Sequence, residues 1–69
     1  MINEEQKLMN EVMDDSYYLN GKGGMYYTAY FWKKDPKYNA ISDYDLDTFQ
    51  SKCRKQVKKY LTESRNQND

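Results

Sequence analysis

Apolar and polar side chains follow a helical period in the N-terminal segment of the chain. The apolar stripe is formed by Leu8, Met9, Val12 and Met13. These spacings bring side chains to one face of a helix. Asn3 precedes the stripe and suits the N-cap position, because its side chain can accept a hydrogen bond from a free backbone amide. The pattern predicts a helix over residues 4–15.

A second apolar stripe runs through the C-terminal third of the chain. It is formed by Leu46, Phe49, Cys53, Val57, Tyr60 and Leu61. Ser42, Asp43 and Asp45 precede it and suit an N-cap, and the positive end of a helix dipole stabilises acids there. We expect a long amphipathic helix that ends near Leu61. Residues 62–69 contain no apolar side chain, so this polar tail is expected to fray.

The segment between the two stripes is typical of antiparallel strands. Residues 25–34 are dense in aromatic side chains and predict the main strand. Tyr17 to Leu19 form either a first strand, joined to the main one by a glycine-rich turn, or the end of the first helix. Residues 38–41 predict a short return strand. We therefore expect one small α+β domain over residues 1–61, with a helix, a two- or three-stranded antiparallel sheet and an amphipathic helix.

The two faces of the predicted main strand differ in character. Alternation places Met25, Tyr27, Ala29 and Phe31 on one face. We expect this face to meet the helices, since Ala29 is small and Phe31 has no polar group. The other face carries rings with polar groups that can stay in water. It is formed by Tyr26, Thr28, Tyr30 and Trp32. This face is either simply solvated or built to bind a partner, because Tyr and Trp are frequent in interface hot spots.

Composition and charge narrow the class of protein. A chain of 69 residues buries only a modest core, but 16% aromatic residues argue against disorder. The formal net charge is zero, yet the charges are segregated. An acidic set lies in the first helix and comprises Glu4, Glu5, Glu11, Asp14 and Asp15. A basic set lies at one end of the hairpin and on the last helix, and comprises Lys33, Lys34, Lys52, Arg54, Lys55, Lys58 and Lys59.

Catalytic chemistry has little support in the sequence. There is no His, and Cys53 falls on the apolar stripe, where a buried, inert thiol is expected. We expect no enzyme activity, no cofactor and no metal site, and we also expect no disulfide. No long apolar run predicts a membrane span. The abundance of Lys, Asn and Tyr indicates an A/T-rich genome, such as those of many phages, and a cytoplasmic location in the host cell is the simplest expectation.

Three functions remain open at this point. The leading hypothesis is a small phage-like protein that binds and inhibits or redirects a larger host protein, such as a nucleic-acid-handling or defence protein. Its contacts would be the aromatic face and the acidic set. The alternative is a nucleic-acid-binding module that uses the basic set, although a pI of about 6.2 weakens attraction to polyanions. The third is a homodimer formed through the sheet.

Overall fold

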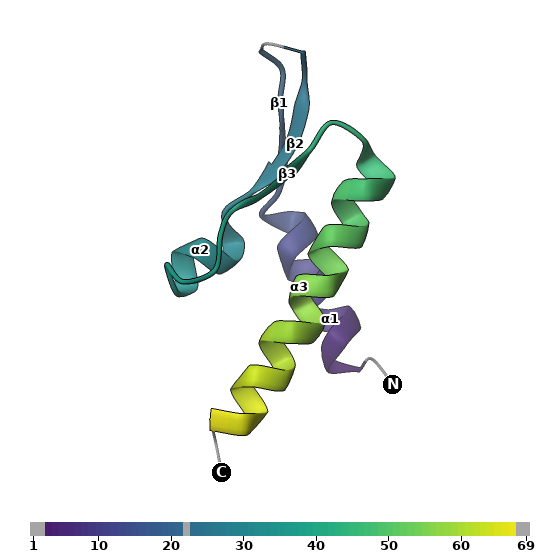
Figure 1. Ribbon diagram of the computed structural model, residues 1–69. Helices are drawn as coiled ribbons and strands as arrows, with labels where there is room; N and C mark the ends of the chain where they lie inside the picture. The colour runs from purple at the N-terminus through teal and green to yellow at the C-terminus, as the bar shows by residue number, and fades with distance from the viewer. Residues whose placement is uncertain (1–2, 22, 68–69) are drawn as a thin grey trace.

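The computed structural model describes residues 3–21 and 23–67 and confirms the expected α+β fold (Figure 1). In chain order the elements are α1 (Glu4–Asp14), β1 (Tyr17–Leu19), β2 (Met25–Thr28), α2 (Tyr30–Lys34), β3 (Ile41–Asp43) and α3 (Leu46–Gln67). The three strands form one antiparallel sheet in the order β1-β2-β3. Helix α3 packs against one face of this sheet, and α1 packs against α3.

The first helix begins and ends close to its predicted limits. The Asn3 side chain accepts a hydrogen bond of 2.7 Å from the Gln6 amide, as expected of an N-cap. Leu8, Met9 and Val12 are buried on the side that meets the core. The apolar stripe therefore predicted both the existence of α1 and the face that it buries.

The hairpin of β1 and β2 settles the alternatives for Tyr17 to Leu19. This segment is a strand, and it pairs with β2 in the register Tyr17↔Tyr27, Tyr18↔Tyr26 and Leu19↔Met25. Gly23 and Gly24 have φ of +91° and +74°, the region that glycine adopts readily. The hairpin projects past the first turn of α3, away from both ends of the described chain (Figure 1).

The predicted main strand is too long, because β2 ends at Thr28 and residues 30–34 form the short helix α2. The buried Thr28 hydroxyl accepts a hydrogen bond of 3.2 Å from the Tyr30 amide. The chain then turns into a helix, in which the Lys33 amide donates to the Ala29 carbonyl at 2.8 Å. This local bonding competes with continued strand pairing, so the aromatic density of the segment was a misleading signal for its second half.

The predicted assignment of the two strand faces was wrong. Thr28 is only 1% exposed, and the Tyr26 ring stacks on Phe49 of α3 with 5.8 Å between centroids. Tyr26 and Thr28 therefore point toward the helices, and alternation places Met25 and Tyr27 on the open face. Phe31 is buried as expected, but from α2 rather than from the strand.

The return strand also begins later than predicted, at Ile41 rather than at residue 38. The Tyr38 amide donates to the Asp35 carbonyl at 2.9 Å, which makes a turn instead of a strand pair. The Tyr38 ring is buried against Phe31 and Tyr60, and its hydroxyl donates to the Glu63 carboxylate. This stretch therefore lies along α3 before it joins the sheet.

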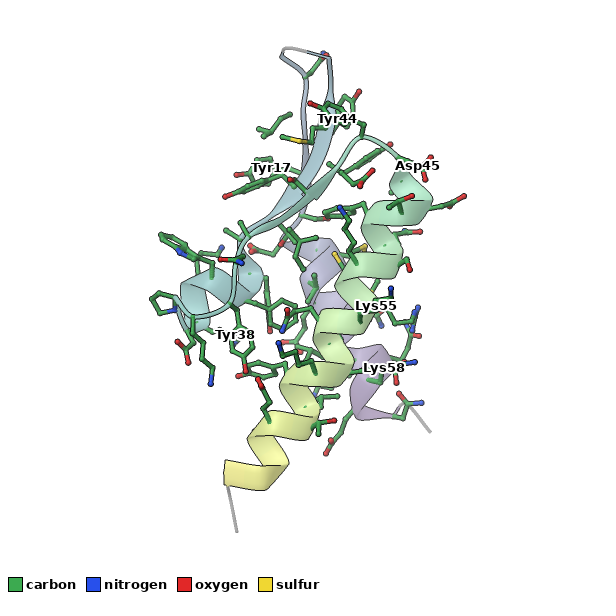
Figure 2. All side chains as sticks on the ribbon, viewed as in Figure 1. Tyr17, Tyr38, Tyr44, Asp45, Lys55 and Lys58 are labelled. Carbon is green, nitrogen blue, oxygen red and sulfur yellow. The ribbon has the colours of Figure 1, made fainter. Side chains whose placement is uncertain are left out.

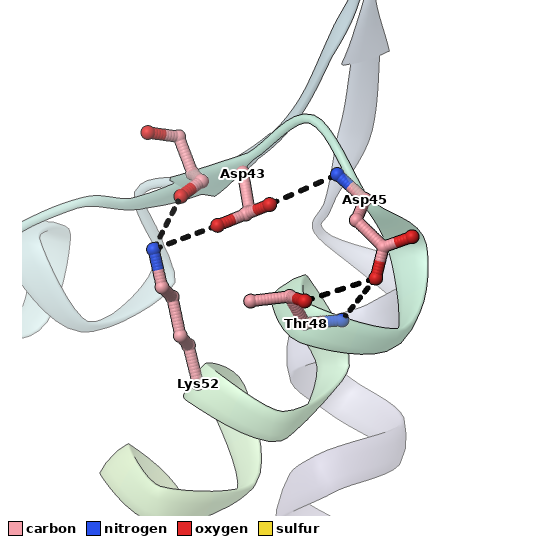
Figure 3. Close-up of polar contacts among 5 residues, drawn as sticks. Asp43, Asp45, Thr48 and Lys52 are labelled. Carbon is pink, nitrogen blue, oxygen red and sulfur yellow. Dashed lines mark hydrogen bonds and ion pairs between the residues drawn. The ribbon is translucent and has the colours of Figure 1, made fainter.

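Helix α3 begins with an N-cap formed by Asp45, one of the residues expected at that position (Figure 3). One Asp45 carboxylate oxygen accepts hydrogen bonds of 2.9 Å from the Thr48 amide and from the Thr48 hydroxyl. The Asp45 amide in turn donates to Asp43 at 2.9 Å. The helix continues to Gln67, beyond the predicted end near Leu61, so fraying of the polar tail stays a prediction, and residues 68–69 lie outside the described residues.

The core lies between α1, α2 and α3 and under the inner face of the sheet. Its buried apolar side chains are Leu8, Met9, Val12, Phe31, Tyr38, Phe49, Cys53 and Val57. Rings of Tyr26, Tyr30 and Tyr60 pack around this cluster and are half-buried. A small core rich in rings therefore holds the strands and helices in place.

Candidate interaction surfaces

Exposed apolar side chains gather at the hairpin. Within the described residues, six large apolar side chains are exposed. Three of them, Tyr17, Tyr18 and Leu19, form β1, while Tyr44 lies in the connection from β3 into α3 and Leu46 is the first residue of α3. The sixth, Trp32, is 51% exposed on α2. We use the name hairpin end for Tyr17, Tyr18, Leu19, Tyr27 and Tyr44.

One side of the hairpin end is the open face of the sheet. Tyr17 lies directly across from Tyr27, and their ring centroids are 5.4 Å apart. Tyr17 is 54% exposed and lies on the side of the sheet away from α3 (Figure 2). Leu19, paired with Met25, extends this face toward the tip of the hairpin. Cross-strand pairing of this kind fixes the rings in one arrangement.

The other side of the hairpin end also carries rings. Tyr18 meets the edge of the Tyr26 ring with 4.9 Å between centroids. Tyr44 is 67% exposed and lies beside the hairpin turn, since its Cε1 is 3.7 Å from where a Cβ on Gly23 would stand. Helix α3 begins below the tip of the hairpin (Figure 1), and Tyr18 is 50% exposed.

The structure does not bring together the aromatic residues that the sequence predicted as one binding face. Tyr26 and Thr28 face the core, and Tyr30 is half-buried with Lys34 Nζ 4.8 Å from its ring centroid. Trp32 is exposed but stands alone on α2. The sequence did contain a signal for the missed residues Tyr17, Tyr18, Leu19 and Tyr27. Residues 16–32 contain a single charged side chain, Lys22, in a chain with 22 charges.

The acidic set is divided between the two ends of α1. Near the start of the helix, Glu5 binds Arg54 of α3 at 3.2 Å. Near its end, Asp15 binds Lys33 of α2 at 2.8 Å and raises the pKa of that lysine. Glu11 and Asp14 line an open groove of about 470 Å³ with Asp15 and α2. Part of the acidic charge is thus neutralised within the molecule, and Glu4 lines a further groove with Glu5 and Lys58.

The basic set is divided as well. Lys33 and Lys34 belong to α2, while Arg54 and Lys58 turn toward the start of α1. Lys52 binds Asp43 at 2.9 Å and the Ser42 carbonyl at 3.3 Å (Figure 3). This ammonium and the Asp45 amide lower the pKa of the Asp43 carboxyl. The open-face rings Tyr17 and Tyr27 lie on the side of the sheet away from α3 and its lysines (Figure 2).

Cys53 lies at the centre of the core with no exposed surface, and burial raises the pKa of its thiol to about 11. Across residues 3–21 and 23–67, no group of three or more His, Cys, Asp or Glu side chains is arranged to hold a metal ion. None of the helices in that part of the chain is both long enough and apolar enough to cross a membrane. Compared with protein-family models, curated proteins and solved structures, the chain shows no significant match.

Proposed function

We propose that this protein is a non-catalytic interaction module that docks a larger protein through its hairpin end. The observation that carries the proposal is the gathering at the hairpin end of four of the six exposed large apolar side chains of the described residues, namely Tyr17, Tyr18, Leu19 and Tyr44. Scattered single apolar residues are ordinary on a protein surface, whereas a contiguous group marks a contact site. Tyr provides large, rigid contact area with a polar group at its tip.

The hairpin end is also organised before any partner binds. Tyr17 packs on Tyr27, and Tyr18 packs on Tyr26, whose ring is held by Phe49 of α3. Because these contacts already restrict the rotamers of the rings, binding costs less side-chain entropy. This arrangement supports a rigid docking surface rather than one that folds on its partner.

The chemistry of the surface defines the partner. Residues 16–32, which include the hairpin, carry one charge in 17 residues. The facing surface of the partner should therefore be apolar with few charges. Glu11 and Asp14 lie on the neighbouring groove and add selectivity for a partner with basic groups around that apolar patch. In its narrower form, which rests on the phage-like composition, the proposal is that the partner is a host protein that this module inhibits or redirects.

The test compares variants of the tagged protein as baits in nuclease-treated lysate of the natural host. Tyr17→Ala and Tyr44→Ala remove exposed rings of the hairpin end, and Trp32→Ala removes a ring of similar exposure elsewhere. We expect one stoichiometric protein with wild type and with Trp32→Ala. Its affinity should fall by about 2 kcal/mol for each hairpin variant, as is typical of hot spots.

Other outcomes would redirect the proposal. Loss of the partner with Trp32→Ala alone would place the site on α2 and contradict the hairpin end. A protein that is recovered from untreated lysate but not after nuclease treatment would favour nucleic-acid binding by the basic set. A concentration-dependent dimer in light scattering, lost with Tyr17→Ala, would assign the hairpin end to a second copy of this chain.

A further inference from the structure

A groove between β3 and α3 carries charge that docking through the hairpin end does not use. Its volume is about 470 Å³, and it is bounded by residues 40–42 on one side and by a basic face of α3 on the other. Lys52, Lys55 and Lys59 stand on that face at spacings of three and four residues, which align side chains along a helix. We call these three residues the lysine row.

Two hydrogen bonds show how the chain runs along this groove. The Tyr38 hydroxyl donates to Glu63 near the end of α3, and Lys52 Nζ donates to the Ser42 carbonyl nearer its start. The segment from Tyr38 to Ser42 therefore runs beside α3 in the opposite direction. Since β3 is the last strand in the sheet order, one of its edges has no strand partner within the described residues. That edge follows the lysine row.

The three lysines of the row differ in their ion pairing within the described residues. Lys52 is held by Asp43 at 2.9 Å and covers the Ser42 carbonyl, so a strand that adds to this edge must displace the ammonium group from that carbonyl. Lys55 and Lys59 are exposed, and neither forms an ion pair with any residue that the structure describes. Two uncompensated ammonium groups beside a strand edge favour an anionic partner.

The spacing of these ammonium groups matches an extended peptide. Four residues of helix advance about 6 Å, which is the separation of Lys55 and Lys59 along α3. Alternate side chains on one face of a strand are about 6.7 Å apart. An extended segment with acids at alternate positions can therefore place one carboxylate at each lysine while its backbone pairs with β3.

We propose that this groove binds an extended acidic segment of a partner protein, which adds to the edge of β3 and places its carboxylates on Lys55 and Lys59. Strand addition of this type obtains affinity from backbone hydrogen bonds and selectivity from side chains on alternate positions. Single-stranded nucleic acid fits the groove less well, because it also needs rings for base stacking. The open-face rings Tyr17 and Tyr27 lie across the sheet from the lysine row.

The experiment titrates the full chain with a fluorescent peptide of about twelve residues in which Glu and Thr alternate, so that all carboxylates project from one face of a strand. The matched probe replaces every Glu by Gln, and an oligothymidylate of similar length represents nucleic acid. The test variant is Lys55→Gln with Lys59→Gln. The control variant, Lys7→Gln with Lys34→Gln, changes the net charge equally but lies outside the groove.

We expect the test variant to bind the acidic peptide about tenfold more weakly than wild type, because charge-assisted contacts each contribute a few-fold in affinity at an exposed site. The control variant should stay within about twofold, since its lysines act only at long range. The amide signal of Ser42, whose carbonyl faces Lys52 at the free edge, should shift on binding and exchange with solvent more slowly. Lys52 is left intact because its removal would also expose Asp43.

Four results would overturn the inference. These are no binding of the acidic peptide, equal weakening in the test and control variants, an amide of Ser42 that does not respond, and tighter binding of the oligothymidylate than of the peptide. The site is separate from the hairpin end, so Tyr17→Ala should leave peptide binding unchanged. A failure at either surface can therefore be recognised without reference to the other.

Discussion

Gly24 combines two constraints at one residue of the hairpin turn. Its φ of +74° lies in the left-handed region that L side chains adopt only with strain. The Tyr18 ring and hydroxyl also occupy the space where a Cβ would stand. The position of the Tyr18 ring, and with it one side of the hairpin end, therefore depends on the absence of a side chain at Gly24.

Gly24→Ala should reduce the free energy of unfolding by about 1–3 kcal/mol, because it adds backbone strain and displaces the Tyr18 ring. Gly21→Ala is the matched control, since nothing lies within 4 Å of its added Cβ and its φ is not positive. It should change stability by no more than about 0.5 kcal/mol. Urea unfolding followed by circular dichroism measures both, and equal effects of the two substitutions would contradict this account.

At the scale of elements, the Tyr38 hydroxyl joins the stretch that leads into β3 to the C-terminal part of α3. The hydrogen bond to Glu63, followed by burial, raises the pKa of Tyr38 to about 12 from its ordinary value of 10.0. The folded protein therefore holds this proton more tightly than the unfolded chain. The resulting stability is fully present below pH 10 and is lost as the pH rises toward 12.

Tyr38→Phe should remove that pH dependence. We expect the wild-type protein to lose stability between about pH 10 and pH 12 more steeply than Tyr38→Phe, because only the wild type has the phenol proton to lose. Tyr44→Phe is the control, as Tyr44 is exposed and its substitution should leave the steep loss intact. Denaturant unfolding at a series of alkaline pH values makes the comparison. Parallel curves for wild type and Tyr38→Phe would show that the Glu63 contact contributes nothing to the linkage.

The elements that could be predicted are those whose apolar stripe decides their structure. Helices α1 and α3 each present a stripe long enough to fix a period, and Asn3 and Asp45 cap them as expected. The prediction of β2 failed at the end of the strand, because the hydrogen bond that the Thr28 hydroxyl accepts from the Tyr30 amide outweighs strand propensity. Such a bond leaves no periodic signal in the sequence. That single break also exchanged the predicted faces, since alternation was continued through residues that are helical.

The candidate site was predictable in kind but not in place. The density of rings in residues 25–34 raised a contact surface as one of two alternatives, yet which rings are exposed depends on the register of β1 with β2. Tyr44 lies beside the hairpin turn only because the connection from β3 into α3 passes close to Gly23. The grouping of lysines at the β3 groove likewise depends on the path of residues 38–42. The sequence alone predicts a strand over residues 38–41.

At the scale of the whole molecule, Cys53 reports on the integrity of the fold. It has no exposed surface and lies in the core cluster with Val12, Phe49 and Val57. Its thiol is protonated at neutral pH, since burial raises its pKa to about 11. A thiol reagent can therefore reach a reactive Cys53 only when the domain opens.

Labelling of Cys53 by a thiol reagent at pH 8 should be slower than labelling of the urea-unfolded chain by about a hundredfold or more, as expected for a small domain of a few kcal/mol stability. The rate should rise as urea lowers the free energy of unfolding. A variant with Cys53→Ala and Ser51→Cys moves the thiol to an exposed position of α3 and should react without protection. Fast labelling of native Cys53 would mean that the core opens locally.

Both ends of the described chain lie at the opposite end of the molecule from the hairpin (Figure 1). A tether fixed at either end therefore leaves the hairpin directed away from the point of attachment. The protein can be anchored to a sensor chip, a bead or the coat of a display particle without masking the hairpin end. In any such array, every copy would present the same aromatic tip to the medium.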